Sequence, residues 1–156
     1  MYDRILVPTD GSEFADDAAD TALELATELD AAVHVVCVVE SGPLGTISLP
    51  GDGASAAEVF EDRATEFVSR IAERAGDRGL EVETEIRRGV PVEEILECAD
   101  EIAADAIVMG SKGRSGLGRA MLGSVTEGVT RYGTVDVLVV GRNADSVASS
   151  ASVDER

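Results

Sequence analysis

Residues 32–39 read AVHVVCVV, an apolar run that is interrupted only by His34. A continuous β-branched run of this length, without alternating polar residues, indicates a strand that is buried on both faces. Such strands occur in parallel sheets that carry helices on both sides. Aromatic residues make up only 3% of the chain and tryptophan is absent, so the core has to be built from aliphatic side chains. The run therefore predicts an α/β protein with a parallel sheet.

Strand and helix patterns alternate along the rest of the chain. Four further short stretches predict strands, at residues 2–7, 80–86, 106–109 and 135–140. Helical patterns occupy the intervals, at residues 12–30 after a capping Ser12, 55–79 after the capping box Ser55-x-x-Glu58, 92–104 after Pro91, and 123–133. Residues 41–53 contain four glycines and two prolines, which predicts a loop.

This alternation predicts a parallel sheet covered on both faces, and right-handed crossovers leave few possible strand orders. We expect a single-domain, Rossmann-like, five-stranded sheet with the order 3-2-1-4-5 over residues 1–141. Ligands of such sheets bind beyond the carboxyl ends of the strands where the order reverses. The first strand ends at Pro8-Thr9-Asp10 and the fourth at Gly110, so these two ends would flank one crevice if the first and fourth strands are neighbours. The small, polar residues 142–156 predict a disordered tail.

The charge of the chain excludes several kinds of partner. Acidic residues outnumber lysine and arginine by 31 to 13, which gives a formal net charge of -18. Such a charge repels nucleic acids and anionic membranes, so neither is expected to bind. It also indicates a protein that works in concentrated salt, where self-repulsion is screened. No apolar run could span a bilayer and no basic leader opens the chain, so we expect a cytoplasmic location.

The two cysteines and the single histidine offer few functional candidates. Cys37 lies in the apolar run and Cys98 in a predicted helix, so both are expected to be reduced core residues. Two thiols and one imidazole are too few for a zinc site. His34 is expected to be a packed side chain with satisfied nitrogens, and without a partner cluster it does not indicate Ser–His catalysis.

A glycine-rich, basic stretch follows the fourth strand. Residues 110–125, GSKGRSGLGRAMLGSV, hold five glycines and three cations but no acid. Glycine permits close backbone approach, so successive amide N–H groups can converge on an oxyanion. The helix predicted to begin at Ser124 adds its N-terminal dipole and a hydroxyl donor. A loop that needs glycine only for its turns is the alternative, but the excess of cations favours phosphate binding. The P-loop sequence and the dinucleotide motif G-x-G-x-x-G are both absent.

The spacing of three of these glycines resembles a known pattern. Gly110-x2-Gly113-x9-Gly123-Ser124 is similar to the ATP-binding signature G-x2-G-x9-G-[ST] of the universal stress protein family. The resemblance covers residues 2–141. It includes ILVPTDGS at residues 5–12, VVCVVE at 35–40, RRGVPVEEIL at 87–96 and VDVLVVG at 135–141.

The resemblance implies a set of nucleotide contacts. Asp10 would contact the ribose, and Pro8 and Thr9 would line the adenine side. Val38 would pack on the adenine and Met109 would cover it. The remaining implied contacts are with the phosphates and the ribose, through Gly110 and Gly113 near the ribose and α-phosphate, and Gly123, Ser124 and Val125 at the β- and γ-phosphates.

These assignments have structural alternatives. Asp10 could form an Asx turn between strand and helix. Val38 is expected in the core whether or not it touches a base. Lys112, Arg114 and Arg119 could be solvated loop charges, and we expect one or two of them, with Lys112 and Arg114 the candidates, to touch phosphate.

The leading hypothesis is an ATP-binding, homodimeric sensor or regulator of the stress response, with Mg²⁺ or Mn²⁺ on the nucleotide. The resemblance implies dimerisation through the fifth strand, Asp136 to Val140, whose apolar edge would otherwise pair without control. No general base is evident and no carboxylate pair is spaced for two-metal chemistry, so any hydrolysis should be slow. A weak ATPase, with Asp10 or Glu127 as a helper, is the enzymatic alternative. The third possibility is an interaction module that binds AMP, a cyclic nucleotide or no nucleotide.

Overall fold

The computed structural model describes residues 2–40, 56–113 and 121–141 of the chain. The predicted loop at residues 41–53, the capping Ser55 and the predicted tail at residues 142–156 lie outside these ranges. The described residues form, in chain order, β1 (Arg4–Pro8), α1 (Glu13–Leu29), β2 (Ala32–Glu40), α2 (Ala56–Asp77), β3 (Val82–Gly89), α3 (Pro91–Glu101), β4 (Ala106–Gly110), α4 (Ser124–Tyr132) and β5 (Asp136–Val140).

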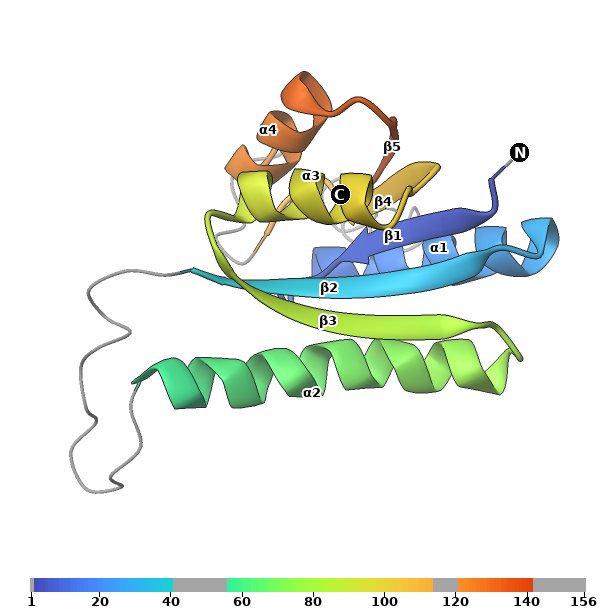
Figure 1. The fold of residues 1–156 in the computed structure, drawn as a ribbon, viewed down its shortest axis with the longest axis horizontal. Coiled ribbons are helices and arrows are strands. Elements are labelled where there is room, and N and C mark those ends of the chain that lie inside the picture. The colour runs from blue at the N-terminus through green and yellow to red at the C-terminus, as the bar shows by residue number, and fades with distance from the viewer. Residues whose placement is uncertain (1, 41–55, 114–120, 142–156) are drawn as a thin grey trace, which may run out of the picture.

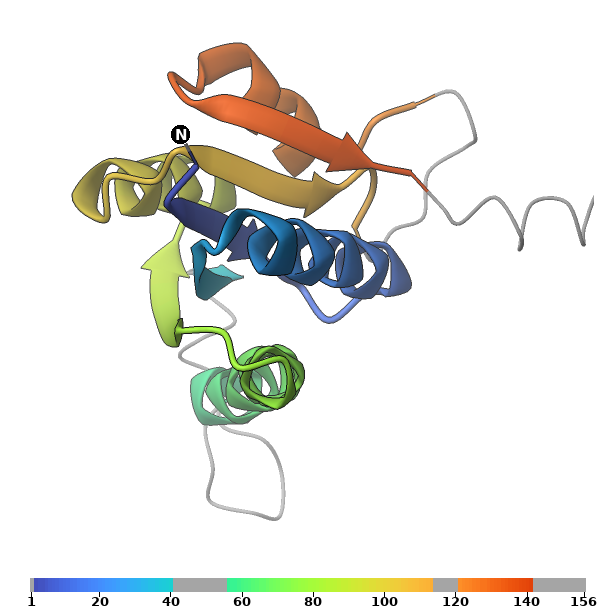
Figure 2. The same cartoon turned by 90° about the vertical axis from the view of Figure 1, so that its right-hand side faces the viewer.

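The strands form one parallel sheet with the order β3-β2-β1-β4-β5, which confirms the order expected from the sequence. Figure 1 shows α2 and α3 on opposite sides of β2 and β3. The view in Figure 2 shows β4 and β5 side by side beyond β1, with the strands pointing the same way. The order reverses at β1, because the chain first builds outward through β2 and β3 and then returns to add β4 on the other side. That reversal leaves a crevice beyond the carboxyl ends of β1 and β4.

The core consists of two apolar layers, one on each face of the sheet. Successive residues of a strand point to opposite faces, so Val7 of β1 belongs to one layer and Leu6 to the other. The first layer packs β1 and β2 against α1 and α2, and it includes Ala19, Leu23 and Ile71. The second packs the sheet against α3 and α4, and it includes Ile95, Ile107 and Val129. Burial on both faces explains why β2 reads as a continuous apolar run.

Two elements end three residues from the predicted position, whereas the other predicted ends differ by two residues or fewer. The third helix was expected to reach residue 104, but α3 ends at Glu101 because Ala103 adopts a positive φ of 54°, which turns the chain toward β4. The third strand was expected at residues 80–86, but β3 spans Val82–Gly89. It pairs with β2 as far as Gly89 opposite Glu40, since an edge strand tolerates the polar Arg87 and Arg88.

Substitutions of the buried Ile107 test the packing of the second apolar layer. Ile107 lies in β4 with none of its surface exposed and belongs to the layer under α3 and α4. We expect Ile107→Val to lower the free energy of unfolding by about 0.5–1.5 kcal/mol and Ile107→Ala by about 2–5 kcal/mol, because each removes buried methyl groups and leaves a cavity. Urea unfolding at a fixed KCl concentration measures both values. Equal stability of the two variants and the unmodified protein would show that this layer is not packed as described.

Candidate functional site

A cavity of about 580 Å³ opens at the carboxyl ends of the strands, where the strand order reverses. Its walls come from the ends of β1, β2 and β4, from α2, and from the segment that leads into α4. The volume lies within the range of small-molecule sites. The topology therefore places one concave, ligand-sized space where parallel α/β sheets bind their ligands.

The residues proposed from the sequence to contact a nucleotide lie together around this cavity. Arg114 and Arg119 lie outside the described residues. The candidates that line the cavity are Pro8, Thr9, Asp10, Val38, Met109, Gly110, Lys112, Gly113, Gly123, Ser124 and Val125. Their roles toward a ligand remain predictions, but segments separated by about a hundred residues converge on one space.

The turn after β1 is fixed by its own hydrogen bonds. The N–H of Thr9 donates to the Val36 carbonyl at 2.9 Å, which ties the end of β1 to β2. The Asp10 carboxylate accepts from the N–H of Ser12 at 2.9 Å, so the Asx turn that was the alternative for Asp10 is present. Ser12 in turn caps α1, accepting from the N–H of Ala15 at 3.2 Å. Asp10, which lines the cavity, is therefore fixed in this turn through a hydrogen bond to its carboxylate.

Gly110 and Gly113 permit contacts that a larger residue would block. A Cβ on Gly110 would lie 2.7 Å from the carbonyl oxygen of Phe14 in α1. A Cβ on Gly113 would lie 2.6 Å from the Asp10 carboxylate. These approaches bring the segment after β4 against the turn after β1, which closes one side of the cavity. Glycine is needed here for space rather than for an unusual backbone angle.

The two described ends of the basic loop are held together. The N–H of Gly123 donates to the Ser111 carbonyl at 2.8 Å, and the N–H of Ser111 donates to the Val140 carbonyl at 3.0 Å. The buried hydroxyl of Thr126 donates to the Gly110 carbonyl at 2.7 Å, which fixes the first turn of α4 to the end of β4. The N-terminus of α4 is thereby aimed at the cavity.

The first turn of α4 presents backbone donors to the cavity. Gly123 is the N-cap residue and provides no side chain to cap the helix. The first hydrogen bond of α4 runs from the N–H of Glu127 to the Gly123 carbonyl at 2.9 Å. The N–H groups that precede Glu127 in the first turn have no acceptor within the helix. Ser124 and Val125 line the cavity. This arrangement, with the positive end of the helix dipole, suits an anionic ligand.

One wall of the cavity was missed by the sequence analysis. Phe60, Arg63 and Phe67 of α2 line it, although no motif in α2 indicates a site. The chain has only three phenylalanines, and two of them lie in this wall. The rarity of phenylalanine in this chain was the sequence signal that could have drawn attention to these two residues. The position of this wall depends on how α2 packs beside β2, and a local sequence pattern carries no information about that packing.

Charges of both signs line the cavity. Among the described lining residues, Asp10 and Glu40 are acidic, whereas Arg63 and Lys112 are basic. Lys112 lies with its ammonium 5.9 Å from the centre of the Phe14 ring, a cation–π distance. The site is therefore less acidic than a chain of net charge -18 would present on average.

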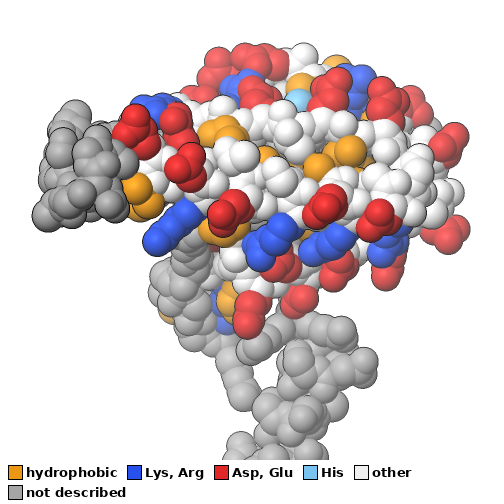
Figure 3. Space-filling model, turned by 90° about the horizontal axis from the view of Figure 1, so that it is seen from below, with side chains coloured by type: hydrophobic (Ala, Val, Ile, Leu, Met, Phe, Trp, Pro, Cys, Tyr) orange, Lys and Arg blue, Asp and Glu red, His pale blue; other side chains and the backbone are white. Residues whose placement is uncertain are grey.

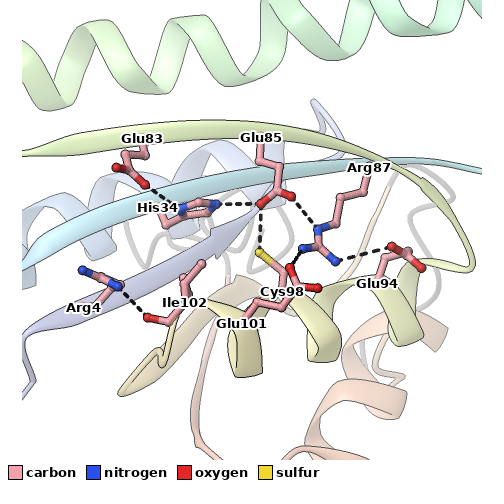
Figure 4. A network of polar contacts seen from close by, with 9 residues as sticks. All are labelled: Arg4, His34, Glu83, Glu85, Arg87, Glu94, Cys98, Glu101 and Ile102. Atoms are coloured by element: carbon pink, nitrogen blue, oxygen red, sulfur yellow. Dashed lines mark hydrogen bonds and ion pairs between the residues drawn. The ribbon is translucent and has the colours of Figure 1, made fainter.

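A second polar cluster lies between the sheet and α3 (Figure 4), and its residues do not line the cavity. His34 Nε2 lies 3.0 Å from Glu85 Oε2, and His34 Nδ1 lies 3.5 Å from Glu83 Oε2. The Cys98 thiol donates to the same Glu85 Oε2 at 3.4 Å, while Arg87 Nε donates to Glu85 Oε1 at 2.8 Å. Both ring nitrogens of His34 face carboxylate oxygens, which belong to a partner cluster that sequence spacing did not reveal.

The cluster shifts the ionisation of its members. Burial and the nearby Glu85 carboxylate raise the pKa of Cys98 to about 12, so its thiol stays protonated at neutral pH. Burial acts to raise the pKa of Glu85, but hydrogen bonds from His34, Cys98 and Arg87 outweigh it and hold that pKa below its usual value. Arg87 also pairs with Glu101, and with Glu94 at 3.5 Å. The charges of this cluster are thus mutually dependent.

The surface combines a dispersed acidic charge with one apolar sheet edge. Figure 3 shows acidic side chains spread over the face that carries α2, with basic side chains among them. At the edge of the sheet, β5 pairs only with β4 within the described residues, and Leu138 is 42% exposed. Tyr132, at the end of α4, is 66% exposed. None of the described helices combines the length and the apolar character needed to cross a membrane.

Comparison with known proteins identifies the family. The model of the universal stress protein family matches residues 1–141. Universal stress protein MJ0531 of Methanocaldococcus jannaschii is 38% identical over 142 residues, which cover 90% of this chain and 82% of that protein.

Two solved structures of similar fold hold adenine nucleotides. A universal stress protein in complex with cAMP matches with a TM-score of 0.68 and 28% identity, over 89% of this chain and 97% of that one. The universal stress protein from Archaeoglobus fulgidus in complex with dAMP matches with a TM-score of 0.63 and 26% identity, over 88% and 97% of the two chains. With the family model covering nearly the whole described fold, this chain belongs to the universal stress protein family.

Proposed function

We propose that this protein binds ATP, with Mg²⁺ or Mn²⁺ on the phosphates, in the cavity at the carboxyl ends of β1 and β4. The observation that carries the proposal is the convergence of Asp10, Gly113 and the N-terminus of α4 on one ligand-sized space. The cAMP and dAMP complexes of two family members support an adenine nucleotide as the ligand class. In this arrangement Val38 and Met109 supply apolar contacts for the base, and Asp10 accepts from the ribose hydroxyls.

A triphosphate uses the cavity more fully than a monophosphate does. In the proposed complex the base contacts the end of β2, and the first phosphate lies near Gly110 and Gly113. The backbone donors at Ser124 and Val125 and the Lys112 ammonium then remain for further phosphate charge. AMP or a cyclic nucleotide is the alternative ligand, and it would leave these donors to water.

Hydrolysis of the bound ATP is expected to be slow. One oxygen of Asp10 is engaged by the Ser12 N–H, and the Glu127 carboxylate pairs with Arg131 at 2.9 Å on the surface of α4. Neither acid is therefore placed as a dedicated base for an attacking water. The protein acts accordingly as a nucleotide-dependent sensor or regulator in the cytoplasm, and its acidic surface suits concentrated salt.

The homodimer is proposed to form through β5. An unpaired strand edge with an exposed Leu138 tends to pair with another chain. Pairing of two β5 strands, Asp136 to Val140, would satisfy their backbone groups and cover the exposed leucine. A dimer would also place two nucleotide sites in one regulatory particle.

Gly123→Ala tests the placement of the phosphates. A Cβ at this position would lie 3.2 Å from Lys112 Cα and 3.4 Å from the Gly113 nitrogen, so the methyl group displaces backbone that lines the cavity. We expect the affinity for MgATP to fall about tenfold or more, equivalent to roughly 1.4 kcal/mol, with little change for adenosine, which has no phosphate. Isothermal titration calorimetry on nucleotide-stripped protein in concentrated KCl measures both affinities.

Gly76→Ala provides the matched control, because nothing lies within 4 Å of a Cβ there and Gly76 does not line the cavity. It should bind MgATP as the unmodified protein does, at about one ATP per chain. Equal weakening of ATP and adenosine in Gly123→Ala would contradict the phosphate placement. The absence of any ATP binding to the unmodified protein would contradict the proposed function.

Leu138→Lys tests the dimer. A charged side chain at the centre of β5 would have to be buried without a partner in the proposed interface. We expect the dimer dissociation constant to rise by roughly tenfold or more, as measured by analytical ultracentrifugation at constant ionic strength. Leu29→Lys at the end of α1, where the leucine is 46% exposed, should leave the dimer intact. A dimer of unchanged stability in Leu138→Lys would rule out pairing through β5.

A further inference from the structure

Three potential metal ligands converge between the sheet and α3, from three different elements. His34 comes from β2, Glu85 from β3 and Cys98 from α3. One nitrogen, one carboxylate oxygen and one sulfur of these residues all lie within 4.8 Å of one another. The two thiols and one imidazole of the sequence are by themselves too few for a zinc site. That count left out the carboxylate, which becomes a candidate ligand only when β3 pairs with β2.

Two of the three separations between the candidate ligand atoms are close to those of ligands around a common ion. His34 Nε2 lies 3.0 Å and Cys98 Sγ 3.4 Å from Glu85 Oε2. Ligands at ordinary zinc bond lengths in a tetrahedral site lie about 3.3–3.7 Å apart. His34 Nε2 and Cys98 Sγ lie within 4.8 Å of each other, so an ion could replace the present hydrogen bonds once these side chains adjust around it. Figure 4 shows the imidazole and the thiol turned toward the same oxygen of Glu85.

The candidate ligands are held in place by second partners. Glu83 lies 3.5 Å from Nδ1, the other nitrogen of His34, so it can accept that proton and leave Nε2 free to coordinate. Arg87 donates to Glu85 Oε1, which leaves Oε2 as the oxygen facing His34 and Cys98. Carboxylate–histidine pairs and hydrogen-bonded carboxylates are the usual supports of metal ligands.

Charge also favours a cation at this position. Three carboxylates of the cluster, those of Glu85, Glu94 and Glu101, share the guanidinium of Arg87, and a fourth, that of Glu83, faces His34. His34 and Cys98 are 7% and 0% exposed, so their candidate ligand atoms lie away from bulk water, whereas the side chains of Glu83 and Glu101 are 76% and 54% exposed. The Glu85 side chain is 32% exposed, so an ion can reach the cluster from solvent through that residue.

We propose that His34 Nε2, Glu85 Oε2 and Cys98 Sγ bind one Zn²⁺ ion, with a water molecule as the fourth ligand. An imidazole, a carboxylate and a thiolate are the ligand types that zinc prefers. On binding, the Cys98 thiol loses its proton to solvent, and the S–H···O hydrogen bond to Glu85 is replaced by the zinc–sulfur and zinc–oxygen bonds. The ion links β2, β3 and α3 and so stabilises the edge of the sheet. The site shares no residue with the cavity proposed for ATP.

Cobalt is the probe for this site. The full-length protein, freed of nucleotide and metal with a chelator, is titrated with Co²⁺ and followed by absorption spectroscopy. We expect one Co²⁺ per chain, a thiolate-to-cobalt charge-transfer band in the near ultraviolet, and displacement of Co²⁺ by Zn²⁺. Zn²⁺ alone should raise the melting temperature of the protein.

Two pairs of variants assign the ligands. Cys37→Ala leaves Cys98 as the only thiol and should keep the band, whereas Cys98→Ser should abolish it. Glu83→Gln should weaken the metal affinity about 10–100-fold, as loss of a supporting partner does. Glu81→Gln removes a nearby exposed carboxylate outside the cluster and should leave the affinity unchanged.

Either of two results would overturn the proposal. One is an unmodified protein without a saturable charge-transfer band, which would mean that the cluster is only a hydrogen-bond network. The other is a band that survives in Cys98→Ser and disappears in Cys37→Ala. Because Cys37→Ala retains all three proposed ligands, the test holds even if Cys98→Ser fails to fold.

Discussion

The reversal of strand order at β1 is the constraint on which the rest of this structure depends. Because β2 and β4 both pair with β1 and their connections leave in opposite directions, the helices diverge at the carboxyl ends of these strands. The cavity occupies the space that results. The strand order brings three segments together at this cavity: the turn after β1, the end of β2 and the N-terminus of α4. The side chains of these segments then determine which ligands the cavity can bind.

Close approach of backbone is the second requirement, and glycine meets it. Gly110 lies against the backbone of Phe14, and Gly113 lies against Asp10, at distances that exclude a Cβ. These contacts seat the segment after β4 on α1, and the Thr126 hydroxyl fixes the start of α4 to the same point. The donors of the α4 N-terminus are therefore positioned before a ligand arrives, which reduces the entropy that binding costs. In this universal stress protein, the N-terminus of α4 is thus fixed beside the cavity, at the place proposed for the phosphates.

The sequence predicted the sheet order and placed most element ends within about two residues, because every strand except β3 is an apolar run and the helix starts at Ser12 and Gly123 have clear capping or breaking residues. The cavity residues near β1 and β4 were also predicted, since strand ends and glycine spacing are local signals. The wall formed by Phe60 and Phe67 was not, because it depends on the packing of α2 beside β2. The His34 cluster was missed for the same reason, as Glu85 becomes its neighbour only through strand pairing.

The amide resonances of the isotopically labelled protein in concentrated KCl, followed during a titration with MgATP, test the nucleotide site most directly. The structure predicts that the largest saturable shifts occur at Gly113, Gly123 and Ser124. Adenosine should move Asp10 and Val38 but leave Ser124 nearly unchanged, and Gly79 at the far end of α2 should respond to neither. Shifts confined to other surfaces, or no saturable shift with MgATP, would contradict the central claim that this cavity holds ATP.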